Sequence, residues 1–173
     1  LHNFGVVWGN QFDNTINTKA HIETTAKEIW SQTSGKIDGF TCAVGTGGTL
    51  AGVSIGLKEK NKNIKIALSD PMGSSLYSYI KNNKLENTGN SITEGIGTGR
   101  ITKNFEKAII DYAYQVDDVE ALKIVFDLIE KQNLSLKAVA KRWQRYYASR
   151  DAMAEAVAKR WQNAFCLKRG GGR

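Results

Sequence analysis

The chain has 173 residues, of which 41% are hydrophobic and 24% charged, with a formal net charge of +7. These values are ordinary for one globular domain and exclude wholesale disorder, and the lack of any apolar run of about 18 residues excludes a transmembrane helix. Two distant cysteines exclude a disulfide framework, and two isolated histidines, His2 and His21, give no metal-binding pattern.

Strands and helices are expected to alternate along most of the chain. Apolar residues at helical spacing, such as Ile22, Ala26 and Ile29, predict a helix, and compact apolar runs predict buried strands. In chain order, the predicted elements are a strand at 4–8, a helix at 14–33, a strand at 40–44, a helix at about 50–60, a strand at 64–68, a short helix at 74–81, a loop at 82–104, a strand at 112–116 and a helix to about 130 that is capped by Asp117 or Asp118. This order predicts an α/β fold, a partial three-layer parallel sheet with flanking helices.

The last part of the chain differs in kind from the rest. Residues 1–136 carry 14 Lys and Arg against 15 Asp and Glu, whereas residues 137–173 carry 10 basic residues against 2 acidic ones. The net charge therefore changes from −1 to +8, and such a step predicts a boundary between a segment at 1–136 and a tail at 137–173. The heptapeptide Ala-Val-Ala-Lys-Arg-Trp-Gln occurs at 138–144 and again at 156–162, with large apolar side chains along one face, which predicts a basic α-helical tail.

A glycine-rich loop is the central candidate site. Gly45-Thr46-Gly47-Gly48-Thr49 lies between the predicted strand at 40–44 and the helix that follows it. Glycines let successive backbone N–H groups approach an anion closely, and the positive end of the following helix points to the same place. The hydroxyls of Thr46 and Thr49 add donors, which favours a phosphate. The alternative is a tight strand-to-helix turn without a ligand.

Several motifs in this chain resemble the cysteine synthase family in order and spacing. They are Asn10-Gln11-Phe12-Asp13-Asn14, Ala20-His21-Ile22-Glu23-Thr24-Thr25, Glu28-Ile29-Trp30, Ala43 to Gly52 around the glycine-rich loop, Thr93-Glu94-Gly95-Ile96-Gly97-Thr98-Gly99-Arg100, and Val116-Asp117-Asp118-Val119-Glu120-Ala121. The resemblance fades after Leu136. It implies the fold-type II architecture of pyridoxal-phosphate (PLP) enzymes, in which the cofactor lies between two α/β domains, and it implies that this chain matches the C-terminal half.

The resemblance also implies roles for single residues. Gly45, Thr46, Gly47, Gly48 and Thr49 would hold the phosphate of PLP through backbone amides and hydroxyls. Gln11 would help to hold the α-carboxylate of the substrate, and Gly95 would leave room for the amino acid; the alternatives are a polar loop residue and a simple turn glycine. The implied reaction replaces the acetate of O-acetyl-L-serine with sulfide to give L-cysteine, and family members are usually homodimers.

Three parts of the family's machinery are missing from this sequence. The Schiff-base lysine of the family lies in a Ser-Val-Lys-Asp-Arg stretch and its substrate loop reads Thr-Ser-Gly-Asn-Thr, and neither occurs here. The Ser-Ser-Gly segment, whose serine contacts the pyridine nitrogen in the family, is replaced by residues 137–141. The first residues have neither an initiator methionine nor a signal pattern. We therefore expect an inactive fragment of a longer cytoplasmic protein.

Other hypotheses remain open at this point. Basic side chains interleaved with tryptophan and tyrosine in 137–173 predict a non-catalytic protein that binds nucleic acid, an anionic membrane surface or a partner groove. The same residues are also interpreted as a tail foreign to the family and without a selected function. A third hypothesis is a poorly folded truncation product with exposed sheet edges.

Overall fold

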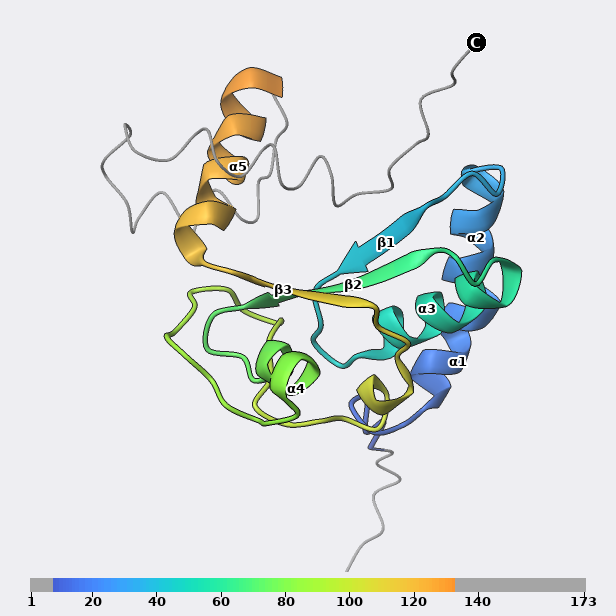
Figure 1. Cartoon of the computed structure of the whole chain (residues 1–173), viewed down its shortest axis with the longest axis horizontal. Coiled ribbons are helices and arrows are strands. Elements are labelled where there is room, and N and C mark those ends of the chain that lie inside the picture. Colours follow the sequence, from blue (N-terminus) through green and yellow to red (C-terminus); the bar gives the residue numbers. More distant parts are fainter. Residues whose placement is uncertain (1–7, 133–173) are drawn as a thin grey trace, which may run out of the picture.

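The structure, a computed structural model, describes residues 8–132 (Figure 1). Its elements are α1 (Ile16–Glu23), α2 (Thr25–Gln32), β1 (Gly39–Cys42), α3 (Gly48–Lys60), β2 (Lys65–Pro71), α4 (Leu76–Asn82), the 3-10 turn η1 (Phe105–Lys107), β3 (Tyr112–Val116) and α5 (Asp118–Gln132). The predicted tail at 137–173 and most of the predicted strand at 4–8 lie outside the described residues. Trp8, the last residue of that strand, is described and has no strand conformation.

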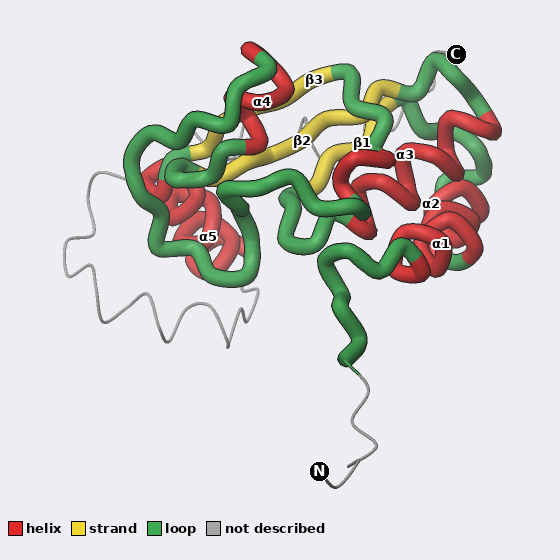
Figure 2. Tube along the Cα trace, turned by 90° about the horizontal axis from the view of Figure 1, so that it is seen from below, coloured by secondary structure: helices red, strands yellow, loops and turns green. Residues whose placement is uncertain are grey.

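The three strands form one parallel sheet in the order β1-β2-β3. Figures 1 and 2 show α3 and α4 on one face of this sheet, with α1 and α2 packed against α3, while α5 leaves the end of β3 on the opposite side. Parallel strands joined through helices are the arrangement that alternating strand and helix patterns predict. The predicted α/β fold with a parallel sheet and flanking helices is confirmed.

The core lies between the sheet and α3. Leu50, Val53 and Leu57 of α3 and Ile66 and Leu68 of β2 are 0% exposed. Burying each of these side chains stabilises the fold by about 1.5–3 kcal/mol relative to leaving it in water. These residues fix α3, and with it the glycine-rich loop at its N-terminus, against the sheet.

The prediction of one helix at 14–33 is wrong, because the chain bends at Thr24 between α1 and α2. Thr24 has φ −117° and ψ −79°, and its hydroxyl donates to the carbonyl of Ala20 at 2.8 Å. This backbone bond from a threonine competes with regular helix geometry. The bend lets both short helices approach glycines of α3: a Cβ at Gly52 would lie 2.5 Å from the carbonyl oxygen of Thr18, and one at Gly56 would lie 2.6 Å from Cβ of Ala26.

The site is positioned by the carboxyl ends of the parallel strands, which meet at one edge of the sheet. The loops after β1 and β2 and the first residues of α5 meet the long connection 83–104 at this edge (Figure 2). Asp117, rather than Asp118, caps α5, since its Oδ1 accepts the N–H of Glu120 at 2.8 Å. None of the helices within residues 8–132 has the length and apolar composition needed to cross a membrane.

Candidate functional site

The glycine-rich loop is enclosed so tightly that it requires its glycines. Gly47 has φ +89°, a conformation that residues with a Cβ rarely adopt, and a Cβ there would lie 2.7 Å from the backbone nitrogen of Phe105. A Cβ on Gly45 would lie 2.5 Å from the carbonyl oxygen of Gly95, and one on Gly48 would overlap the side chain of Asn17. The loop therefore lies between η1, the 94–97 segment and α1.

The backbone N–H groups of this loop are not used by the sheet. Within residues 8–132, the N–H groups of Thr46, Gly47, Thr49 and Leu50 make no hydrogen bond. The first intrahelical bond of α3 runs from the N–H of Ala51 to the carbonyl of Gly47 at 3.0 Å. Four N–H groups without a partner at the positive end of a 13-residue helix are donors that an anion could accept from, as the sequence predicts.

The hydroxyl of Thr46 is oriented as a donor. Its Oγ1 accepts from Nδ2 of Asn17 at 2.9 Å and from the N–H of Gly48 at 3.3 Å. With both lone pairs engaged, the hydroxyl proton points elsewhere and is available to an anion. The carbonyl of Thr46 accepts from the hydroxyl of Thr102 at 2.7 Å, which holds the backbone of the loop.

The hydroxyl of Thr49 contacts His21. Nε2 of His21 lies 3.1 Å from Oγ1 of Thr49, and Nδ1 lies 2.9 Å from Oγ1 of Thr25. When Nε2 carries the proton, it donates to Thr49 and leaves the threonine proton for an anion in the loop. An anion would therefore favour the Nε2–H form of His21, with Thr25 donating to Nδ1.

The other two sequence-predicted site residues lie beside this loop. Gln11 is exposed, and its backbone carbonyl accepts from Nδ2 of Asn17 at 3.1 Å and from Nδ2 of Asn104 at 3.0 Å. Gly95 has φ +83°, its carbonyl oxygen faces Gly45, and a Cβ there would meet nothing within 4 Å. The structure thus brings Gln11, residues 45–49 and Gly95 together, while the role of each residue stays a prediction.

Sequence reasoning missed the polar residues that join these parts. Asn104 is 0% exposed; its Oδ1 accepts from the hydroxyl of Thr18 at 2.7 Å, and its Nδ2 also donates to the carbonyl of Phe12 at 2.7 Å. The carboxylate of Asp13 accepts from the N–H of Lys103 at 3.0 Å and from the guanidinium of Arg100 at 3.3 Å. The bond from Lys103, followed by that from Arg100, holds the pKa of Asp13 below its usual value.

The signal that could have found these residues was weak. Asn104 closes a polar, glycine-rich stretch in which asparagine is an ordinary loop residue. Its partners lie 86 to 93 positions away in the sequence, so no local pattern marks it as buried. The only hint is that it is followed directly by an apolar residue, Phe105, which is also buried.

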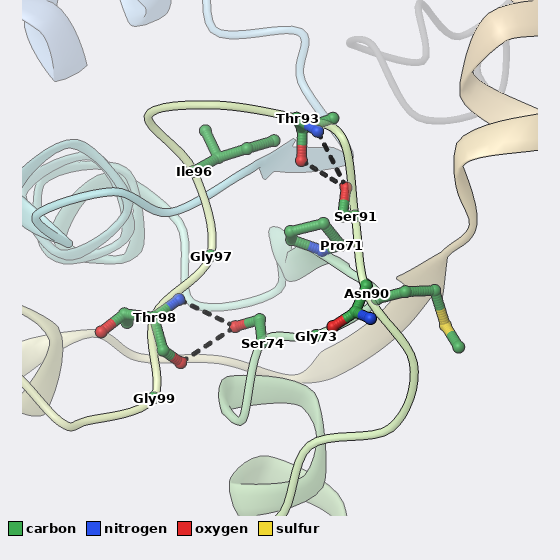
Figure 3. A pocket seen from close by; sticks show the side chains of 11 residues that line it. Pro71, Gly73, Ser74, Asn90, Ser91, Thr93, Ile96, Gly97, Thr98 and Gly99 are labelled. Atoms are coloured by element: carbon green, nitrogen blue, oxygen red, sulfur yellow. Dashed lines mark hydrogen bonds between the residues drawn. The ribbon is translucent and has the colours of Figure 1, made fainter.

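A cavity of about 270 Å³ lies beside the segment that carries Gly95 (Figure 3). It is lined by residues 71–74, 90, 91, 93 and 96–99, and neither Gly95 nor residues 45–49 line it. Its hydroxyls are engaged within the protein: Oγ of Ser74 donates to the carbonyl of Thr98 at 3.1 Å and accepts its N–H at 3.0 Å, and Oγ of Ser91 lies 2.6 Å from Oγ1 of Thr93. The cavity is therefore a hollow behind the segment that carries Gly95.

The described residues offer little other reactive chemistry near the loop. Burial raises the pKa of the Cys42 thiol to about 12, so this thiol is protonated at neutral pH and is a poor nucleophile. Within residues 8–132, no three His, Cys, Asp or Glu side chains are arranged to hold a metal ion. Binding of an anionic group by residues 45–49 stays a prediction.

Comparison with known proteins agrees with this geometry. A family model described as pyridoxal-phosphate dependent enzyme matches residues 2–141. Cysteine synthase 1 of Emericella nidulans is 47% identical over 137 residues, which cover 76% of this chain and 37% of that protein. The chain thus spans little more than a third of the length of this relative.

Two solved structures are also similar. A hydrogen sulfide-producing enzyme of Fusobacterium nucleatum superposes with a TM-score of 0.63 at 35% identity, over 72% of this chain and 40% of that one. O-acetyl serine sulfhydrylase isoform 3 of Entamoeba histolytica superposes with a TM-score of 0.63 at 34% identity, over 72% of this chain and 35% of that one. The resemblance to cysteine synthases is confirmed, and the cofactor of the matched family, PLP, carries a phosphate that suits the free amides and hydroxyls of residues 45–49. The chain belongs to the family of pyridoxal-phosphate dependent enzymes.

Proposed function

We propose that this chain supplies the cofactor-phosphate and substrate-carboxylate sites of an enzyme that converts O-acetyl-L-serine and sulfide into L-cysteine. The observation that carries the proposal is the set of four free N–H groups at Thr46, Gly47, Thr49 and Leu50, at the N-terminus of α3. A phosphate dianion suits this position, because its oxygens can accept from several N–H groups and its negative charge is favoured at the positive end of a helix. The names of the relatives, cysteine synthase and O-acetyl serine sulfhydrylase, support the choice of substrates.

Each residue contributes binding or space. The hydroxyls of Thr46 and Thr49 donate to the phosphate beside the backbone amides. Within residues 8–132, no hydrogen-bond partner contacts the side-chain amide of Gln11, which leaves it available to the substrate carboxylate. Gly95 leaves room for the amino acid, since nothing lies within 4 Å of its Cβ position. When bound, PLP supplies the electron sink for the reaction, and the protein supplies binding and orientation.

The proposal includes inactivity of this polypeptide on its own. No lysine in the sequence lies in the Ser-Val-Lys-Asp-Arg context of the family, and no serine follows in the place of the partner of the pyridine nitrogen. Without that lysine, no group of the chain forms the resting covalent link or moves the α-proton. We propose that the chain binds PLP through its phosphate and catalyses only with a polypeptide that supplies the lysine.

The decisive experiment measures PLP binding and turnover by the same purified chain. We expect saturable binding, observed as a shift of the ³¹P resonance of PLP, without formation of cysteine from O-acetyl-L-serine and sulfide. Replacing both Thr46 and Thr49 by valine should weaken binding at least about tenfold, because two charge-assisted hydrogen bonds are lost. Thr33→Val, at the distant end of α2, is the matched control. Unchanged binding by the double variant, or normal turnover by the unmodified chain, contradicts the proposal.

A second candidate function rests on the charge of residues 137–173, which lie outside the described residues. A net charge of +8 with interleaved aromatic side chains favours an anionic partner, such as a nucleic acid or a membrane surface. Salt-dependent retention on heparin that is lost on deletion of 137–173 would support it, and retention that survives the deletion would exclude it. The homodimer, the cytoplasmic location and the boundary at 136/137 stay predictions.

A further inference from the structure

We propose that Asp118 is a positioning residue that anchors the segment carrying Gly95 above the phosphate site. This inference rests on the proposed function, because it assigns to Asp118 the task of keeping the substrate side of that site in place. Asp118 lies outside residues 45–49 and does not bond to them. Replacing Asp118 is therefore expected to change the affinity for the substrate amino acid and not the affinity for the cofactor phosphate.

Two neighbouring aspartates at the start of α5 bond to different parts of the protein. Asp117 caps the helix through the N–H of Glu120. The carboxylate of Asp118 is turned to the 91–97 segment instead: Oδ1 accepts the hydroxyl of Ser91 at 2.6 Å, and Oδ2 accepts the N–H of Ile92 at 2.8 Å. Both bonds are short and involve a charged acceptor, which places them among the stronger hydrogen bonds of a protein.

The anchor continues into the segment through Ser91. Because the proton of Ser91 is donated to Asp118, its Oγ is left as an acceptor, and it accepts the N–H of Thr93 at 3.1 Å and the hydroxyl of Thr93 at 2.6 Å. Figure 3 shows Ser91 and Thr93 joined in this way at one side of the cavity. Residues 91–93 thus form a turn whose geometry depends on the carboxylate of Asp118.

The far end of the segment is held independently. The N–H of Gly97 donates to the carbonyl of Val44 at 2.7 Å, and the N–H of Thr98 donates to Oγ of Ser74 at 3.0 Å. Between the two fixed ends, residues 94–96 are exposed and bring the carbonyl of Gly95 against Gly45. Releasing the Asp118 end therefore frees one support of the tip that carries Gly95 and leaves the other in place.

Hydrogen exchange of backbone amides in the full chain tests the anchor directly. In Asp118→Ala, the amides of Ile92 and Thr93 should exchange at least about tenfold faster, because two charge-assisted bonds are lost. Ser91→Ala removes the hydroxyl bonds alone and should accelerate Thr93 more than Ile92. Asp117→Ala is the matched control; it should accelerate the first amides of α5 and leave 91–97 unchanged. Exchange of 91–97 at the wild-type rate in Asp118→Ala, or equal acceleration in Asp117→Ala, overturns the inference.

Ligand affinity separates positioning from general destabilisation. In Asp118→Ala loaded with PLP, calorimetric titration with L-serine should show a several-fold weaker affinity, while the affinity for PLP itself stays at the wild-type value. An equal loss of both affinities would show that the residue only stabilises the fold. If the wild-type chain fails to bind PLP, the proposed function fails, whereas the exchange comparison still decides whether Asp118 anchors the segment.

Discussion

Asn17 of α1 donates a 2.9 Å hydrogen bond from Nδ2 to Oγ1 of Thr46 in the loop after β1. The same nitrogen donates to the carbonyl of Gln11 at 3.1 Å, so one side-chain amide joins the proposed carboxylate site to the proposed phosphate site. It also occupies the space that a Cβ on Gly48 would need. The position of α1 therefore sets the direction of the Thr46 hydroxyl.

Replacing Asn17 by alanine should weaken phosphate binding without unfolding the chain. The hydrogen bonds to Thr46 and to the backbone carbonyl of Gln11 are both lost. The bond to Thr46 contributes about 1 kcal/mol, and without it the Thr46 hydroxyl is free to rotate, which predicts a loss of affinity of about 3- to 10-fold. Titration with inorganic phosphate, followed by ³¹P NMR, measures it. Asn63→Ala, at an exposed position away from the loop, is the control. Equal affinities of Asn17→Ala and the wild type would show that Thr46 is held by its other contacts.

Gly45→Ala should displace the segment that carries Gly95. The new Cβ would lie 2.5 Å from the carbonyl oxygen of Gly95, a backbone atom that cannot rotate away. Overpacking of this kind costs about 1–3 kcal/mol of the free energy of unfolding. Gly99→Ala is the matched control, because nothing lies within 4 Å of its Cβ position and its φ is not positive. Urea unfolding should show a lower midpoint for Gly45→Ala alone; equal midpoints would contradict the close approach.

The parts of the fold that sequence predicted are those set by local pattern. The strands predicted at 40–44, 64–68 and 112–116 overlap β1, β2 and β3, because runs of apolar residues that are bounded by polar or glycine-rich stretches mark buried strands wherever they occur. The glycine-rich loop was found because its residue types are required by its own backbone.

What the sequence did not predict depends on distant partners. The helical periodicity of 14–33 is continuous and does not mark the bend at Thr24, which brings α1 and α2 against glycines of α3. The bond between Asn17 and Thr46 spans 29 positions, and that between Thr18 and Asn104 spans 86. Such contacts are products of the tertiary fold and leave no periodic trace in the chain.

The pH dependence of stability should reveal Asp70, whose carboxyl group is 0% exposed at the end of β2. Burial raises its pKa above the usual 3.8, although the N–H of Tyr77 donates to Oδ2 at 2.8 Å and opposes the shift. Within residues 8–132, its Oδ1 has no hydrogen-bond partner. The ionised carboxylate is therefore poorly solvated in the folded state.

The direction of this pH dependence follows from the linkage between proton binding and folding. Since the folded state binds this proton more tightly than the unfolded state, the stabilisation from protonated Asp70 is fully present below pH 3.8 and is lost as the pH rises through the raised pKa. Asp70→Asn should remove this loss and be more stable than the wild type at neutral pH. The difference in free energy of unfolding between the two proteins should shrink on acidification. A difference that is independent of pH would show that folding does not change the pKa of Asp70.

Asn104 should be the polar residue whose loss costs most stability. Its side chain makes four hydrogen bonds at 0% exposure, to Thr18 through Oδ1 and to the carbonyls of Gln11 and Phe12 through Nδ2. Asn104→Ala leaves these groups without partners in the interior and should lower the free energy of unfolding by about 2–4 kcal/mol. Urea unfolding followed by circular dichroism measures it, with Asn63→Ala as the exposed control.

Asn104→Asp separates the contribution of the hydrogen bonds to stability from the contribution of side-chain packing at this position. Aspartate has nearly the same volume and keeps an acceptor for Thr18, but it turns two donors into an acceptor that faces the carbonyls of Gln11 and Phe12. If the hydrogen bonds hold the 10–14 turn in place, Asn104→Asp should be destabilised at neutral pH about as much as Asn104→Ala and should recover part of its stability when acid protonates the new carboxyl group. If only the filled volume matters, Asn104→Asp should unfold at the same urea concentration as the wild type.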